Sequence, residues 1–399
     1  MLGLVIFFSA TQLGLHFWPT SSLVYGIRVD YLAPTIYLFD LLLLGYLVAR
    51  RSDLLRKSWL SAKMFSRTSK TNSETRSDLI GTLAPILLVN LLFSANPLST
   101  LSWSLHFLLY LLFFLSLPKI YLLKSISYVL PLTLLFQLAL SFTQVYLGHS
   151  IGGLMYYLGE RSIAVGQPAV ALGSFMDSVV LRAYGTFGHP NVLAGWSIIS
   201  LLILLRLKSN IYLLASATAT TAMMVMLAQS RSALITLFGL VIPFYLIKKL
   251  KVRLVYFAIV LSSLFSLLSP TQILSPSRAE LSLSQRLDLQ GLSWKVVSRY
   301  PIFGTGAQAS ISTYPSLAPG NRLLQPDHNS FTLFLSWFGL LGVLALLYSL
   351  RLLLSPSIHL LSPLLPLLAL DHYFLTSPQG LFIFLLYLKL KYSHAQKNL

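Results

Sequence analysis

Long apolar runs alternate with short polar loops along almost the whole chain. A helix of about 20 apolar residues is long enough to cross the hydrocarbon core of a bilayer. The pattern predicts an all-α, polytopic integral membrane protein with about twelve transmembrane helices, forming a single transmembrane domain over residues 1–399. The predicted segments are 2–19, 31–49, 79–95, 101–118, 127–146, 190–206, 210–228, 232–247, 254–270, 331–350, 358–372 and 379–390.

The composition agrees with this prediction. Of 399 residues, 55% are hydrophobic and only 10% are charged, which is too little charge to cover the surface of a soluble protein. The chain has no cysteine, which excludes disulfides, thiolate catalysis and cysteine-bound metals. It starts apolar at Met1 without a basic stretch, so we expect the first segment to be a retained helix.

The positive charge follows the loops. A net charge of +18 is typical of nucleic-acid binding, but most of this charge lies in short loops between apolar segments. Twenty of the 29 lysines and arginines fall in alternate loops, the largest group from Arg50 to Arg76. The positive-inside rule then places both termini in the cytoplasm, and no nucleic-acid partner is expected.

The nine other basic residues are predicted on the outer face, and eight of them are arginine. Arginine binds phosphate oxygens in bidentate fashion, whereas lysine serves equally well as a topology signal. Arg231 lies between two predicted helices with almost no loop, and a snorkelling interfacial arginine is the alternative interpretation. The nine are Arg28, Arg161, Arg182, Arg231, Arg278, Arg286, Lys295, Arg299 and Arg322.

Two outer loops are long, and the first, 147–189, ends in a glycine-flanked turn that follows Arg182. Glycines allow backbone to approach a ligand closely, and a proline suits the first turn of the helix that follows. A guanidinium beside free backbone N–H groups can bind phosphate, and an ordinary loop-to-helix junction is the alternative. Whether His189 and Asn191 touch a substrate or shape the turn stays open at this point.

The second outer loop, 271–330, contains an amphipathic stretch from Ser282 to Tyr300. We expect this stretch to form a helix at the outer membrane interface that presents Arg286 and either Lys295 or Arg299 on its polar side.

Histidines lie at the predicted outer ends of two transmembrane segments. A neutral histidine such as His328 can accept a proton from a hydroxyl, and a helix-entry capping role is the alternative. Asp371 and His372 form a second candidate pair, again with a structural alternative. Asp40 is the one carboxylate well inside a predicted helix, where function and hydrogen-bonded packing are both open. No metal is implied, because no acidic or histidine cluster has convincing ligand spacing.

Four short motifs, all predicted on the outer side, carry a family resemblance. They are Arg182 with Gly185-Thr-Phe-Gly-His-Pro-Asn191, Ser230-Arg231-Ser-Ala, Gln285-Arg286 followed by Pro301-Ile-Phe-Gly-Thr-Gly306, and His328-Asn329 before a helix with Gly339 and Gly342. In this order and spacing they resemble the O-antigen ligase and polymerase family of bacterial envelope glycosyltransferases. His189 is a departure, since the family often has asparagine there.

The resemblance implies transfer or polymerisation of a glycan from an undecaprenyl-diphosphate carrier at the outer face of the bacterial cytoplasmic membrane. It implies a helical fold of the glycosyltransferase C type, no metal or other cofactor, and a glycan, lipid or protein acceptor. Carried onto this sequence, Arg182, Arg231 and Arg286 would hold the diphosphate, and His328 would serve the acceptor hydroxyl. Further candidates around them are His189, Asn191, Asn329, Arg299, Asp371 and His372. Ligase and polymerase are not distinguished.

The residues fit this chemistry independently. A diphosphate leaves without protonation by a carboxylic acid, so cations at the phosphates and one base at the acceptor suffice. The alternative is a transporter or flippase of lipid-linked sugars or small anions, which would place charges near the bilayer midplane on broken helices. This chain has one such charge, Asp40, and gathers its arginines on one face. A non-catalytic scaffold would leave those arginines unexplained.

Overall fold

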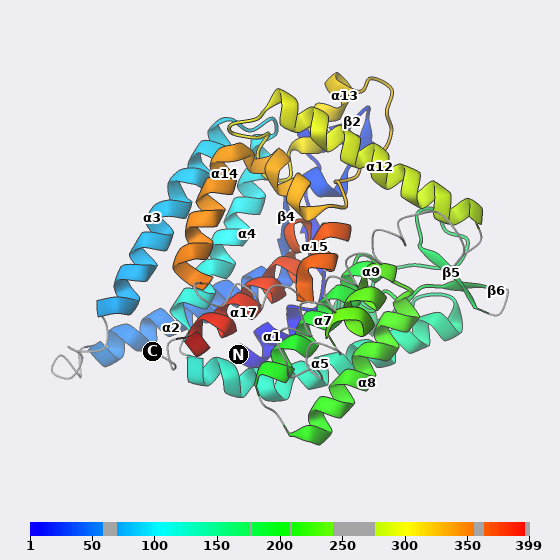
Figure 1. The fold of residues 1–399 in the computed structure, drawn as a ribbon. Coiled ribbons are helices and arrows are strands. Elements are labelled where there is room, and N and C mark those ends of the chain that lie inside the picture. The colour runs from blue at the N-terminus through cyan, green and yellow to red at the C-terminus, as the bar shows by residue number, and fades with distance from the viewer. Residues whose placement is uncertain are drawn as a thin grey trace.

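The computed structural model describes residues 1–58, 70–117, 119–175, 178–207, 210–241, 276–354 and 363–395, and the chain is mostly helical over these ranges (Figure 1). The helices of the first half are α1 (Leu2–Phe8), α2 (Leu38–Ser58), α3 (Lys70–Leu92), α4 (Pro97–Ser116), α5 (Lys119–Leu147), α6 (Leu154–Tyr157) and α7 (Pro190–Arg206). Those of the second half are α8 (Ile211–Ala228), α9 (Arg231–Leu234), α12 (Pro276–Arg299), α13 (Tyr314–Leu317), α14 (Ser330–Leu354), α15 (Leu365–Leu370), α16 (Tyr373–Thr376) and α17 (Pro378–Ala395).

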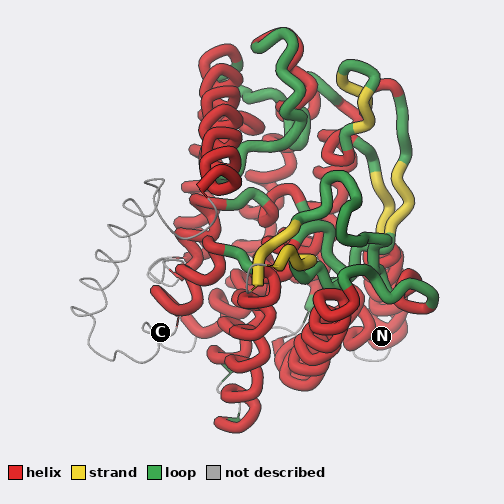
Figure 2. Tube along the Cα trace, turned by 90° about the vertical axis from the view of Figure 1, so that its right-hand side faces the viewer, coloured by secondary structure: helices red, strands yellow, loops and turns green. Residues whose placement is uncertain are grey.

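Three antiparallel two-stranded sheets accompany the helices, drawn as yellow segments in Figure 2. The pairs are β1 (Gly14–His16) with β4 (Thr35–Tyr37), β2 (Leu23–Val24) with β3 (Ile27–Arg28), and β5 (Leu172–Phe175) with β6 (Ser178–Leu181). The all-α prediction is therefore wrong in detail, because it overlooked these hairpins. They occur in the N-terminal connection and in the first outer loop, while the fold as a whole is helical.

Four helices of the described ranges are long and apolar enough to cross a membrane: Pro97–Ser116, Tyr121–Leu147, Ile211–Ala228 and Ser330–Ser349. Three shorter apolar helices accompany them: Gly81–Leu92, Pro190–Arg206 and Pro378–Leu390. These helices are consistent with a membrane protein, but a count of twelve is not confirmed. The predicted segment 254–270, and residues 242–247 of the segment before it, lie outside the described residues.

Helix α7 lies at the centre of the fold. Every residue from Pro190 to Leu204 is buried, so the helix is enclosed on all sides. It packs against α5, α8 and α17 (Figure 1). Gly195 makes the contact with the C-terminal segment possible, because a Cβ there would lie 1.7 Å from the Tyr373 hydroxyl. The N-terminus of α7 is therefore fixed by the core.

The first predicted segment, 2–19, is not one helix. Helix α1 ends at Phe8, and the side chains of Ser9 and Thr11 donate to the Ile6 and Phe8 carbonyls that the helix leaves free. The chain then pairs Gly14–His16 with Thr35–Tyr37 as a hairpin. Apolar content predicted burial correctly but could not distinguish a short helix and strand from one long helix.

Other predicted segments also change length. Helix α2 begins at Leu38 rather than at residue 31, since Pro34 disfavours helical backbone before it and a strand follows. In the eighth segment, α9 gives way at once to a π-helical stretch over Ile235–Val241. The described part of the eleventh is the short α15, which ends before Asp371. The twelfth is a helix that is longer than predicted, and its apolar part, Pro378–Leu390, is one of the three shorter apolar helices.

The first outer loop is held by a buried carboxylate. Glu160 accepts hydrogen bonds from the backbone N–H groups of Ile151 and Gly152 and from Gln144 Nε2 of α5, at 2.8 to 2.9 Å. This carboxylate satisfies two backbone donors of a segment that has little regular structure and one side-chain donor of α5. The loop is consequently anchored on α5 rather than free over the surface.

The second outer loop contains the predicted amphipathic helix, observed as α12. Leu289, Leu292 and Val296 of α12 are buried in a small apolar core shared with the N-terminal hairpin β2–β3 and with η4 (Ser310–Thr313) and α13. Leu287 of the same helix is 59% exposed. The helix thus packs on protein along one side, and its remaining surface is exposed.

The predicted outer loops contact one another. Asn96 Nδ2 donates to the Ser21 carbonyl at 2.7 Å, and Gln308 Nε2 donates to the Thr376 carbonyl at 3.3 Å. These four residues come from four loops that the charge alternation assigns to one side of the membrane. Each of the two contacts therefore joins loops that the lysine and arginine pattern predicts on the same side.

The segment Pro301–Gly306 forms backbone hydrogen bonds with α14 at a break in that helix. Four backbone hydrogen bonds of 2.9 to 3.1 Å join residues 301–306 to residues 336–341. At the break, Gly339 has φ 61° and ψ −166°, and a Cβ there would lie 2.3 Å from the Ile302 carbonyl oxygen. Such backbone is essentially restricted to glycine. The glycines of this motif therefore serve close backbone packing.

We expect Gly339→Ala to destabilise the protein by at least about 2 kcal/mol, because alanine is strained in this conformation and collides with the Ile302 carbonyl. Thermal unfolding of the purified protein in detergent measures the effect. Gly291→Ala on α12 is the matched control, since its Cβ meets nothing within 4 Å and alanine favours helix. Equal melting temperatures for the two variants would contradict the packing role of Gly339.

Candidate functional site

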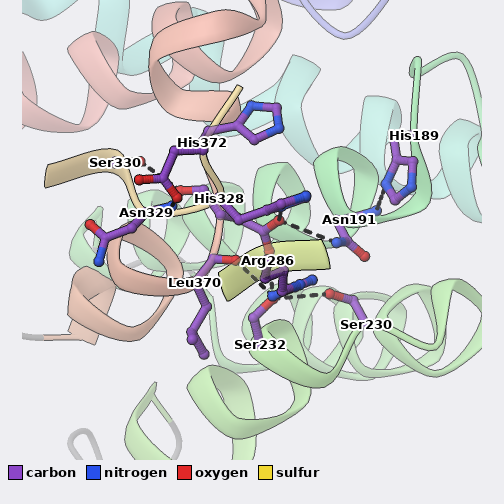
Figure 3. Close-up of polar contacts among 12 residues, drawn as sticks. His189, Asn191, Ser230, Ser232, Arg286, His328, Asn329, Ser330, Leu370 and His372 are labelled. Atoms are coloured by element: carbon purple, nitrogen blue, oxygen red, sulfur yellow. Dashed lines mark hydrogen bonds and ion pairs between the residues drawn. The ribbon is translucent and has the colours of Figure 1, made fainter. Parts of the chain in front are cut away.

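A buried carboxylate, Asp371, joins the helices that carry the predicted site residues. It lies between α15 and α16 with 2% of its surface exposed. Its Oδ1 accepts from Asn191 Nδ2 of α7 at 3.2 Å, and its Oδ2 accepts from Ser232 Oγ of α9 at 2.7 Å. Its backbone carbonyl accepts from Ser330 Oγ of α14 at 2.6 Å (Figure 3). One residue therefore ties together the N-terminal ends of three helices.

His328 approaches the same carboxylate. Its Nδ1 lies 3.6 Å from Asp371 Oδ1, and its ring centroid lies 5.0 Å from that of His372. Burial alone would raise the pKa of Asp371, but His328, Arg286 and the Ser232 hydroxyl outweigh it and hold that pKa below its ordinary value. Asp371 is thus an ionised carboxylate that can orient the His328 ring, leaving Nε2 to face a substrate.

Arg182 reaches this cluster through Asn191. Its Nη2 donates to Asn191 Oδ1 at 2.7 Å, and its Nε donates to the Ala228 carbonyl at 2.7 Å. Burial lowers the pKa of Arg182 to about 10, and the charges of Arg286 and Arg231 lower it further. Contacts bring the other two arginines to the same place, because Arg286 donates to the carbonyl of Leu370, beside Asp371, and Ser232, beside Arg231, donates to Asp371. Arg182 is still protonated at neutral pH.

No carboxylate pairs with these three arginines within 4 Å in the described part of the chain. Arg286 Nη1 donates to the Leu370 carbonyl at 3.1 Å, as Figure 3 shows, and Arg231 exposes its side chain without a hydrogen bond to the described residues. Three cations beside the single charge of Asp371 leave an excess of positive charge. Such a cluster is suited to a doubly charged phosphate group.

Two glutamines of α5 position the turn that follows Arg182. Gln144 Oε1 accepts from the N–H groups of Tyr184 and Gly185 at 3.2 and 2.8 Å. Gln137 Oε1 accepts from the Thr186 N–H at 3.1 Å, while its Nε2 donates to the Thr186 hydroxyl at 2.7 Å. The N–H groups of Tyr184, Gly185 and Thr186 are consequently satisfied by protein. At Gly185, the ordinary-junction alternative is therefore the one observed.

His189 and Asn329 shape helix starts. His189 Nδ1 accepts from the Asn191 N–H at 3.2 Å and caps α7, and Asn329 Oδ1 accepts from the Phe331 N–H at 2.9 Å and caps α14. Burial, with Arg182 nearby, lowers the pKa of His189 to about 3, so this ring is neutral. Burial likewise lowers the pKa of His372, whose Nδ1 contacts the Thr376 hydroxyl at 2.7 Å.

Two predicted candidates lie apart from the cluster. Arg299 stands exposed at the end of α12, beside a shallow groove that contains Trp294 and Leu317. Asp40 lies at the start of α2, where it accepts from the Tyr110 hydroxyl at 2.9 Å and lies 3.1 Å from His106 Nε2. The packing alternative for Asp40 is therefore observed, together with a histidine partner that sequence reasoning did not identify.

A cavity of about 610 Å³ opens beside the cluster. His328, Asp371 and His372 line it, together with residues of the N-terminal segment, α4 and α17. Arg182, Arg231 and Arg286 are absent from its wall. Asp371 and Asn191, which both line the cavity, therefore separate it from the arginines that contact them. Within the described ranges, no group of three His, Cys, Asp or Glu residues could hold a metal ion.

Comparison with protein families adds an independent finding. The model of the O-antigen ligase family matches residues 216–348. The matched segment is about a third of the chain. The match confirms the resemblance predicted from the motifs and contains Arg231, Arg286 and His328. Arg182 and Asp371 lie outside the matched residues, and contacts in the folded chain bring them next to that segment. A comparison with curated proteins finds no match.

Sequence reasoning placed the arginines and histidines together but missed what connects them. Asp371 was one candidate among several, and the structure makes it the residue that contacts three helices and His328. The serine after Arg231 was quoted only as part of a motif, yet Ser232 bonds the carboxylate directly. The one available signal was an aspartate beside a histidine at a predicted outer helix end.

We expect His189→Asn to make stability less sensitive to acid. The folded-state pKa of about 3 lies below the ordinary value of 6.5, so the unfolded state binds more protons between these values and stability falls as pH falls. The slope from one such group is at most about 1.4 kcal/mol per pH unit, and asparagine keeps the cap. Chemical denaturation at pH 7, 6, 5 and 4 measures it. Equal slopes for both proteins would contradict a buried neutral His189.

Proposed function

We propose that the protein transfers a glycan from an undecaprenyl-diphosphate carrier to a hydroxyl of an acceptor at the outer face of the bacterial cytoplasmic membrane. The observation that carries this proposal is the position of the His328–Asp371 pair between an unpaired arginine cluster and a cavity. The match of residues 216–348 to the O-antigen ligase family supports this reaction class.

The reaction divides between the two sides of Asp371. The acceptor hydroxyl enters from the cavity, and His328 Nε2 accepts its proton as the oxygen attacks the anomeric carbon. The bond from that carbon to the diphosphate oxygen breaks, and its electron pair stays with the phosphate. Arg182, Arg231 and Arg286 stabilise that developing charge on the far side. Attack opposite to departure inverts the configuration at the anomeric carbon.

Asp371 supports the base. As His328 takes the proton, the imidazolium ion gains a favourable interaction with the ionised carboxylate 3.6 Å away. Asn191 links that carboxylate to Arg182, so the base and the phosphate-binding group share one hydrogen-bonded frame. General base catalysis of this kind contributes roughly 10²–10⁴-fold to the rate.

The charge distribution supports an outer location for this site. The site residues come from the loops that the positive-inside rule assigns to the outside. The undecaprenyl chain is apolar and would stay in the bilayer, while its diphosphate reaches the arginines at the membrane surface. No metal is required, because arginine supplies the positive charge at the leaving group.

The topology is tested with single cysteines, since the natural chain has none. Ser298→Cys on the exposed face of α12 should react with a membrane-impermeant maleimide in intact cells. Lys124→Cys at the exposed start of α5 should react only after the cells are permeabilised, because it lies in a predicted cytoplasmic loop. The reverse pattern would overturn the assignment of sides.

Replacement of site residues tests the chemistry with purified protein, carrier-linked oligosaccharide and acceptor. We expect His328→Ala to lower turnover about 10²–10⁴-fold while carrier binding persists, because only the base is removed. Arg231→Lys should also impair transfer, because lysine keeps the charge but loses the bidentate contact. Arg299→Lys is the matched control and should keep full activity, since Arg299 lies outside the cluster. Unchanged transfer by both site variants would refute these roles.

A further inference from the structure

The cavity also contains hydrogen-bonding side chains that the proposed chemistry does not use. Gln12 and Gln379 line the cavity, and their Nε2 atoms are buried and have no hydrogen-bond partner among the described residues. Gln379, near the start of α17, has only 4% of its surface exposed. A buried donor without a partner destabilises a fold, so two on one cavity wall indicate a polar ligand.

His106 adds an acceptor to the same wall. Its Nε2 lies 3.1 Å from Asp40 Oδ2, and Asp40 is fixed by the Tyr110 hydroxyl and the Tyr37 N–H. With Nε2–H directed at the carboxylate, Nδ1 carries the free lone pair, and it has no partner among the described residues. The wall therefore offers two amide donors and one oriented imidazole acceptor.

Aromatic side chains also line the cavity, and the Tyr31 ring lies 5.7 Å from that of His372. Trp103, Tyr31 and Tyr37 all line it, and the Trp103 ring is fixed by its Nε1–H, which donates to the Leu375 carbonyl at 2.7 Å. Arg161 is the single lysine or arginine on the described wall, and its Nη1 already donates to the Gly188 carbonyl. The wall also includes the carboxylates of Asp30, Glu160 and Asp371, which disfavour an anion there. Flat apolar rings with amide donors and no excess of positive charge suit a hydroxyl-rich ligand that carries no negative charge.

We infer that Gln12, Gln379 and His106 form a sugar subsite for the acceptor. The inference rests on the proposed function, in which the acceptor reaches His328 from the cavity and the carrier diphosphate lies on the arginine side. A sugar ring would place C–H groups on the aromatic rings and hydroxyls on the amides and on His106 Nδ1. The Asp40–His106 pair then positions the acceptor and takes no part in proton transfer at the reacting oxygen.

Binding of sugars without the lipid carrier tests the subsite apart from catalysis. The probes are a repeat-unit oligosaccharide released by mild acid and the delipidated core oligosaccharide of lipopolysaccharide. Their dissociation constants are measured by ligand-observed NMR with wild type, Gln379→Leu and His106→Phe in nanodiscs. We expect at least one probe to bind wild type and to bind each variant about 10-fold more weakly. Gln290→Leu on α12, outside the cavity, is the matched control and should bind like wild type.

Stability and kinetics separate recognition from packing. Gln379→Leu removes an unpartnered buried donor, so its melting temperature should equal or exceed that of wild type. In the transfer assay, its KM for the acceptor should rise while kcat and the KM for the carrier change little. Failure of both probes to bind wild type, or equal binding by wild type and Gln379→Leu, would overturn the subsite. Sugar binding by a wild type that forms no transfer product would instead count against the proposed function alone.

Discussion

The site depends on the burial of one ionised carboxylate. A charge as enclosed as that of Asp371 is tolerated only with hydrogen bonds and compensating positive charge around it. Asn191, Ser232 and His328 supply these contacts from three separate elements. Loss of any one would leave the carboxylate poorly compensated, so the requirement to satisfy Asp371 fixes how α7, α9 and α14 meet. The positions of the base and the arginines follow from that requirement.

Sequence patterns predicted which residues gather at this site, but not the contacts that hold them there. The arginines were identifiable because they break the lysine and arginine bias of the predicted cytoplasmic loops, and His328 because it lies at the start of a predicted helix; both signals survive uncertainty in helix boundaries. The glycines after Arg182 suggested free backbone donors, yet Gln137 and Gln144 occupy those donors from a helix about 40 residues away in the chain. Hydrogen bonds between distant segments leave no local pattern. For the same reason, periodicity alone could not reveal the hairpin that interrupts residues 2–19.

The two sides of Asp371 favour two different kinds of ligand. Positive charge is gathered on one side of Asp371, where Arg231 is exposed and unpaired, while the cavity on the other side is lined by amides and aromatic rings. An anion and an uncharged polyol are therefore favoured on opposite sides of one histidine. In the proposed reaction, this division would keep the charged carrier and the polar acceptor in separate binding sites.

The backbone pairing between residues 301–306 and the break at Gly339 has a consequence for engineering. Asn90 of α3 reinforces it by donating to the Trp337 carbonyl and accepting from the Ala307 N–H. Residues 301–306 and the part of α14 around Gly339 are thus joined to each other and to α3 by hydrogen bonds. A chimaera that exchanges the outer loop with that of a relative should join the chains within α12, and should inherit 301–306 and α14 from the same parent. A junction between them would combine two halves of a backbone interface that must match atom for atom.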